Sequence, residues 1–184
     1  MSPTDPPPDV AETGALASFG EHLDPALVVV TTTDGTERAG CLVGFHTQCS
    51  IGPDRYAVWL SKANHTYRVA LFAGHLAVHL LGEDDRDVAE LFGTTTGDDV
   101  DKFERCAWTP GPGGVPLLDR LPNRLVGRRV SLYDENDSDH VCVMLAPEVV
   151  ETTASFAPLR LSTVAELVPG HEAKGRPVPR SLDP

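Results

Sequence analysis

The sequence predicts a mainly β fold, a small antiparallel barrel with short helices between its strands. Short segments rich in β-branched residues follow one another closely, and turn residues separate most of them. Strands do not alternate with long helices, and no Gly-x-Gly-x-x-Gly motif is present, which argues against a dinucleotide-binding α/β sheet. At least six short strands with two or three small helices fit an antiparallel barrel best.

The strongest local signals are a hairpin turn and a capped helix. Asp34-Gly35 ends a β-branched run over residues 26–33, which predicts a tight turn and a return strand over 37–46. Asn64 is a favoured N-cap for a helix expected over 65–73. Further strands are expected over 56–61, 76–81, 124–133 and 140–150.

The segments between these elements are predicted to be short helices and loops. Asp84 or Asp85 is expected to cap one helix, and Asp98 a shorter one that includes Phe103. Residues 108–122 carry four prolines and three glycines, so we expect an irregular surface loop there.

Length and charge limit what the chain can be. Its 184 residues suit one domain, expected over 10–168 with a weak helix over 10–22, a disordered tail over 1–9 and an arm or disordered tail over 169–184. The 15 basic and 27 acidic residues give a net charge of −12, which disfavours nucleic acids and anionic membrane surfaces as partners. No signal-peptide core or membrane-spanning run is found, so a cytoplasmic protein is expected.

The cysteines and histidines do not indicate a metal site. The four cysteines form no Cys-x-x-Cys pair and match no zinc or disulfide framework, so we expect reduced thiols. His46, His75 and His79 lack the compact spacing of ligands on one helix. Packing or surface roles are therefore expected for these histidines, and no metal site is predicted.

Residues 40–66 combine a polar loop with a helix start. Small and hydroxyl side chains in the first part would let backbone N–H groups approach a flat polar ligand. Asn64 then begins a helix, and the first N–H groups of a helix have no internal partner and favour an anion. Lys62, His65 and Thr66 add one cation and two hydrogen-bonding groups. This combination predicts a phosphorylated, ring-bearing cofactor, and FMN fits.

Seven short pieces then occur in a fixed order, over 28–32, 40–50, 61–66, 76–81, 101–103, 114–117 and 139–141. In this order they resemble the flavin reductase-like family, and the resemblance covers about residues 24–151. It implies an FMN-binding split β-barrel and a homodimer that holds FMN or FAD near the subunit interface. It also implies reduction of that flavin by NADH or NADPH, and delivery of reduced flavin to a partner monooxygenase.

The resemblance also implies roles for individual residues. The residues expected to line the isoalloxazine and ribityl chain are Phe45, His46, Thr47, Gln48, Cys49, Ser50 and Ile51. Those expected to hold the phosphate are Ser61, Lys62, Asn64, His65 and Thr66. Lys102 and Phe103 match a pair close to the flavin in relatives, and His140 matches a catalytic histidine near the nicotinamide. Trp59 and Trp108 are expected to be packing anchors.

Two other functions stay open, because four positions depart from the family pattern. These positions are Cys41, Gly44, Asp54 and His79, where threonine, serine, proline and asparagine are usual. The first alternative is a non-catalytic flavin-binding or carrier protein. The second is a reductase that depends on a deazaflavin.

Overall fold

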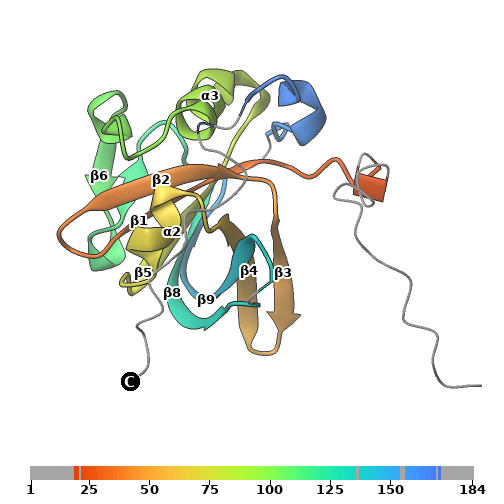
Figure 1. Ribbon diagram of the computed structural model, residues 1–184. Coiled ribbons are helices and arrows are strands. Elements are labelled where there is room, and N and C mark those ends of the chain that lie inside the picture. The colour runs from red at the N-terminus through yellow and green to blue at the C-terminus, as the bar shows by residue number, and fades with distance from the viewer. Residues whose placement is uncertain (1–18, 21, 136, 154–155, 169, 171–184) are drawn as a thin grey trace, which may run out of the picture.

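The computed structural model describes residues 19–20, 22–135, 137–153, 156–168 and 170. Seven strands form one curled antiparallel sheet in the order β2-β1-β5-β8-β9-β4-β3 (Figure 1). These strands are β1 Val28–Thr33, β2 Arg38–Val43, β3 His46–Ile51, β4 Asp54–Ser61, β5 His75–Leu80, β8 Arg124–Tyr133 and β9 His140–Glu151. The predicted mainly β, antiparallel fold is confirmed.

Short helices lie against this sheet. They are α2 His65–Ala70 and α3 Arg86–Thr94, with the 3-10 turns η1 Glu83–Asp85, η2 Lys102–Glu104, η3 Pro112–Gly114 and η4 Leu161–Val164. Helix α2 lies inside the curl of the sheet (Figure 1), where Tyr67 and Ala70 pack in the core with Val30 and Leu60. Helix α2 therefore plugs the open barrel, as the sequence predicts.

Strand β1 is buried on both faces. Val28 and Val30 belong to the core inside the curl, whereas Leu27 and Val29 pack with Phe92 of α3 on the other side. Because alternate residues of a strand point to opposite faces, this central strand divides the core into two clusters. Its β-branched composition is typical of a strand covered on both sides.

Both strong local signals are confirmed. Gly35 has φ +94, and the Asp34 carboxylate accepts hydrogen bonds from the N–H groups of Thr36 and Glu37 at 2.8 Å each. The Asn64 Oδ1 accepts from the Thr66 N–H at 3.0 Å, which caps α2 at the predicted residue. The return strand ends at Val43 and α2 ends at Ala70, each three residues earlier than expected.

The prediction of a polar loop in the first part of residues 40–66 was wrong, because His46–Ile51 form strand β3. Strand β3 pairs with β4 along its length and forms the end of the sheet. The side chains of β3 are mostly exposed and polar, as expected of an edge strand. Such a strand does not need alternating apolar residues, so its sequence lacks the usual strand pattern.

The expected cap at Asp98 was also wrong. Turn η2 is capped by Asp101, whose Oδ1 accepts from the Phe103 N–H at 2.9 Å. The Asp98 carboxylate instead bonds to Arg68 and His65 of α2. Partners so distant in the sequence cannot be identified from local spacing.

The expected irregular loop over 108–122 contains a small second sheet. Strand β6 Trp108–Pro110 pairs with β7 Pro116–Leu118 across η3. Gly113 and Gly114 have φ +65 and +79, a conformation that favours glycine, and they turn the chain between the two strands.

Two further findings concern the ends of the domain and membranes. The predicted helix over 10–22 lies almost entirely outside the described residues, as do the tails expected over 1–9 and 169–184. Within the residues that the structure describes, no helix is both long and apolar enough to cross a membrane.

Candidate functional site

A cavity of about 370 Å³ lies where β2, β4, α3 and η4 meet. Four of the predicted site residues line it: Phe45, Ser61, Asn64 and His140. These four come from three separate segments of the sequence. A cavity of this size is in the range of small-molecule sites.

Strand pairing brings these residues together. In the register between β4 and β9, Ser61 lies opposite His140, and Trp59 opposite Cys142. The Trp59 N–H donates to the Phe45 carbonyl at 2.9 Å. The Phe45 ring then meets the His140 ring edge-on, with 5.4 Å between their centroids. The side chains at this end of the sheet are thus placed by the backbone ladder.

The start of α2 offers three hydrogen-bond donors without an acceptor among the described residues. The Ser61 Oγ accepts from the Ala63 N–H at 3.3 Å, and this leaves the Ser61 hydroxyl proton available. The Asn64 Oδ1 is used by the Thr66 N–H, which leaves the side-chain NH₂ of Asn64. The backbone N–H of His65, the first residue of α2, is the third donor. Such a set suits the oxygens of a phosphate ester.

The rest of the cavity wall is mostly apolar. Val43, Phe45, Trp59 and Phe92 line it, and so do Leu161 and Leu167 near its C-terminal side. An apolar slot with a polar end fits a flat aromatic ring that carries a phosphorylated chain. The residues present therefore fit a flavin nucleotide.

His140 is held by its neighbour. Its Nδ1 lies 2.7 Å from the Asp139 Oδ1, and this hydrogen bond lowers the pKa of Asp139 below its ordinary value. This contact with the carboxylate fixes the orientation of the imidazole ring. The Nε2 of His140 has no partner among the described residues, so it is available to a ligand in the cavity.

Comparison with known proteins identifies the family of this chain. Residues 22–161 match the flavin reductase like domain. The chain belongs to the flavin reductase-like family. The curled antiparallel sheet is accordingly the split barrel that the sequence predicts.

Three proteins that are similar to this chain are named as reductases or oxidoreductases. FMN reductase (NADH) RutF of Stutzerimonas stutzeri is 32% identical over 95 residues, which are 51% of this chain and 54% of that protein. The reductase component of the flavin-dependent trigonelline monooxygenase of Acinetobacter baylyi is 26% identical over 102 residues, 55% of this chain and 32% of that protein. The NADH:FAD oxidoreductase SgcE6 of Streptomyces globisporus C-1027 has the same fold, with a TM-score of 0.70 at 19% identity over 83% of this chain and 92% of that one. The chain thus spans about a third to a half of the length of these two curated relatives.

Several residues that were predicted to contact the flavin lie outside the cavity, on strand β3. The half-buried ring of His46 is 2.6 Å from the Tyr56 hydroxyl and 2.8 Å from the Ala26 carbonyl, and partial burial lowers its pKa. The Ser50 hydroxyl donates to the Pro53 carbonyl within the β3–β4 hairpin. Thr47, Gln48, Cys49 and Ile51 are exposed along the same edge. The structure therefore does not bring these residues into the cavity.

Three of the predicted phosphate ligands use their side chains for other contacts. The Lys62 Nζ lies 2.6 Å from the Asp134 carboxylate in the β8–β9 turn. The His65 ring lies between Glu37, at 3.0 Å, and Asp98, at 3.1 Å. The Thr66 hydroxyl is buried without a hydrogen-bond partner among the described residues. Among the residues predicted to bind the phosphate, Ser61 and Asn64 line the cavity.

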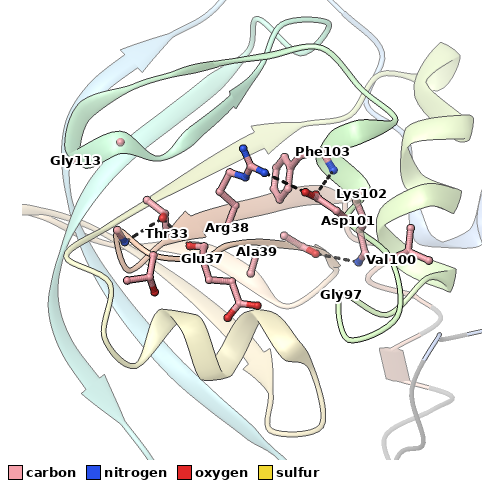
Figure 2. A pocket seen from close by; sticks show the side chains of 14 residues that line it. Thr33, Glu37, Arg38, Ala39, Gly97, Val100, Asp101, Lys102, Phe103 and Gly113 are labelled. Carbon is pink, nitrogen blue, oxygen red and sulfur yellow. Dashed lines mark hydrogen bonds and ion pairs between the residues drawn. The ribbon is translucent and has the colours of Figure 1, made fainter.

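Lys102 and Phe103 border a second, larger cavity of about 620 Å³ (Figure 2). The Lys102 Nζ donates to the carbonyls of Gly40 and Phe92 at 3.0 and 3.3 Å, and burial lowers its pKa. Phe103 packs edge-on against Phe92 in the core. This larger cavity contains an Arg38–Asp101 ion pair but lacks the other predicted residues, so the smaller cavity is the candidate site.

Trp59 is a lining residue that the sequence analysis assigned to packing. Its neighbours Val58 and Leu60 are buried in the core, whereas Trp59 and Ser61 are half-buried on the opposite face. The alternation along a strand would have placed Trp59 beside Ser61. Sequence reasoning missed it because a tryptophan in an apolar strand is commonly a core residue.

His75 and His79 lie outside the cavity and have different partners. His75 bonds to Glu148 at 3.0 Å and His79 contacts the Thr31 hydroxyl at 3.2 Å. The four cysteines are free thiols. In the described part of the chain, no three His, Cys, Asp or Glu side chains lie close enough together to hold a metal ion.

Proposed function

We propose that this protein is an NAD(P)H-dependent flavin reductase that binds FMN or FAD in the 370 Å³ cavity. The observation that carries the proposal is the convergence of four predicted residues on one apolar slot, two of which, Ser61 and Asn64, offer available donors at its polar end. Family membership and the name of the Stutzerimonas relative, an FMN reductase (NADH), support the reaction class. FMN is the simplest ligand for this slot, since it combines the ring with a terminal phosphate.

In this proposal the start of α2 binds the flavin phosphate. The Ser61 hydroxyl, the Asn64 side-chain NH₂ and the His65 N–H donate to its oxygens. Phe45 and Trp59 cover the ring and exclude water from it. A bound flavin supplies the hydride chemistry, and the protein supplies orientation and electrostatics.

His140 is the proposed catalytic residue. Its Nδ1 bonds to Asp139, which sets the ring orientation and leaves Nε2 for the nicotinamide or for a proton. The contact of the His140 ring with Phe45, a lining residue of the slot, supports a role for this nitrogen beside the flavin. His140 thus orients the second substrate and can hold a proton close to the ring.

The proposal includes partners and a location. The name of the Acinetobacter relative supports delivery of reduced flavin to a monooxygenase. A homodimer is supported by the edge of β3, which ends the sheet of the described residues, and by Ile51 on that strand, which is 87% exposed. A cytoplasmic location and a domain over 10–168 remain predictions from the sequence.

The phosphate assignment is tested by Asn64→Asp. Aspartate caps a helix as well as asparagine does, so the fold should keep its stability. The new carboxylate replaces a donor by a negative charge, which repels the phosphate by about 1–4 kcal/mol at 4 Å. FMN affinity should therefore fall about tenfold or more, whereas affinity for riboflavin, which lacks the phosphate, should stay unchanged. Fluorescence titration measures both dissociation constants.

Ser131→Asp is the matched control, because it adds the same charge on the exposed part of β8. It should leave both affinities at their wild-type values. Equal FMN binding by wild type and Asn64→Asp would contradict the phosphate assignment. NADH or NADPH consumption with excess FMN separates a reductase from a carrier, and no consumption above background would contradict the catalytic proposal.

A further inference from the structure

The C-terminal turn forms one wall of the candidate cavity. Leu161, Val164 and Leu167 all line it. The match to the flavin reductase like domain ends at residue 161, so Val164 and Leu167 lie beyond it. In Figure 1, η4 lies beside α3 at the same end of the sheet. Two of these three wall residues are therefore supplied by a segment outside the matched domain.

Backbone hydrogen bonds fix the entry to this turn. The Leu27 N–H donates to the Leu159 carbonyl at 2.8 Å, and the Leu159 N–H donates to the Leu81 carbonyl at 2.8 Å. Leu159 is itself buried. The segment before η4 is thus hydrogen-bonded to two core residues.

Side chains fix the turn itself. Both carboxylate oxygens of Asp24 accept from Ser162, one from its N–H at 2.9 Å and one from its hydroxyl at 3.0 Å. Asp24 has φ +37, an uncommon conformation for a residue other than glycine. Arg86 of α3 donates to the Thr163 carbonyl at 2.5 Å and pairs with Glu166. The wall is consequently a fixed surface.

We propose that the η4 wall, defined as Leu161, Val164 and Leu167, binds the dimethylbenzene edge of the flavin and so fixes the ring's orientation and affinity. This inference rests on the proposed function. The three side chains contain no hydrogen-bonding atom. The pyrimidine edge of isoalloxazine carries two carbonyls and an N–H, which would lose their hydrogen bonds against such a wall. The dimethylbenzene edge has no such group, so it is the edge that fits.

The test compares riboflavin with an analogue that lacks the 7- and 8-methyl groups. In the wild type, burial of both methyls against the wall should make riboflavin bind roughly tenfold more tightly than the analogue. In the variant Leu161→Ala with Leu167→Ala, this ratio should fall to about twofold, because the methyl groups lose their contacts. Leu167→Ala alone should give an intermediate ratio and serves if the double variant does not fold.

Val168→Ala is the matched control, because Val168 follows the wall directly but is 75% exposed. It should keep the wild-type ratio. The same ratio in the wild type and in the wall variants, or no preference for the methylated ring in the wild type, would overturn this inference alone. Failure of the wild type to bind either flavin would instead overturn the proposed function.

Discussion

Between pH 7 and pH 4, the free energy of unfolding is expected to fall by about 3 kcal/mol more in the wild type than in a variant with His79 replaced by asparagine. His79 is fully buried, and burial is the main cause that lowers its pKa from 6.5 to about 4. Above pH 6.5 the ring is neutral in both states and stability is complete. As the pH falls towards 4, the unfolded state takes up a proton that the folded state does not, so the free energy of unfolding decreases.

The surroundings of His79 explain why it resists protonation. The Thr31 hydroxyl donates to the Pro116 carbonyl at 2.6 Å, so its oxygen is left to accept from the His79 Nε2 at 3.2 Å. The Nδ1 has no hydrogen-bond partner among the described residues, and the backbone of Pro116 and Leu121, which favours the charged form, does not offset the effect of burial. The positive charge of Arg124 adds to the effect. Asparagine is the usual residue at this position in the family pattern, and its side chain cannot titrate.

Urea unfolding at pH 7.0 and pH 4.5 measures this effect. Between the two pH values, the free energy of unfolding should fall further in the wild type than in His79→Asn. The difference between the two decreases should be most of the ~3 kcal/mol. His75→Asn is the control, because His75 is partly exposed and pairs with Glu148, and it should retain the wild-type loss. Identical losses in the wild type and His79→Asn would show that this histidine is not the source.

Phe92→Ala is expected to lower the free energy of unfolding by about 3–5 kcal/mol. Phe92 is 1% exposed and its ring packs edge-on against Phe103, with 5.8 Å between centroids. A Cβ on Gly40 would lie only 2.8 Å from the Phe92 ring, so β2 and α3 are in close contact at this point. Lys102 also lies over this ring, at 5.5 Å. Truncation would leave a cavity that surrounding strands cannot close.

Phe72→Ala is the matched control, since Phe72 is 65% exposed and its truncation should change stability by about 0.5 kcal/mol or less. Phe92→Leu should fall between the two, because leucine fills part of the space. Urea midpoints with unchanged m-values give the three differences. A loss below about 1 kcal/mol in Phe92→Ala would contradict the role of this ring as the contact between α3 and β2.

The sequence by itself determined the local elements. Asp34-Gly35 specifies a hairpin because glycine readily adopts positive φ, and Asn64 specifies a helix start because its side chain accepts from the helix N–H groups. The β-branched runs specify strands in the same way, through the preferences of their own backbone. Four residues predicted for the site, among them Ser61 and His140, also proved to line one cavity.

The tertiary structure alone decided which side chains face that cavity. Lys62 is drawn to Asp134, Lys102 to two buried carbonyls, and Asp98 to α2. Each of these partners is far away in the sequence, so no local pattern could reveal the competing contact. The cavity wall formed by Trp59 depends on the pairing of β4 with β9. The wall formed by the η4 turn depends on the hydrogen bonds of Leu159 with Leu27 and Leu81. Local preferences are set within a few residues, whereas a site is set by packing between segments that meet only in the folded chain.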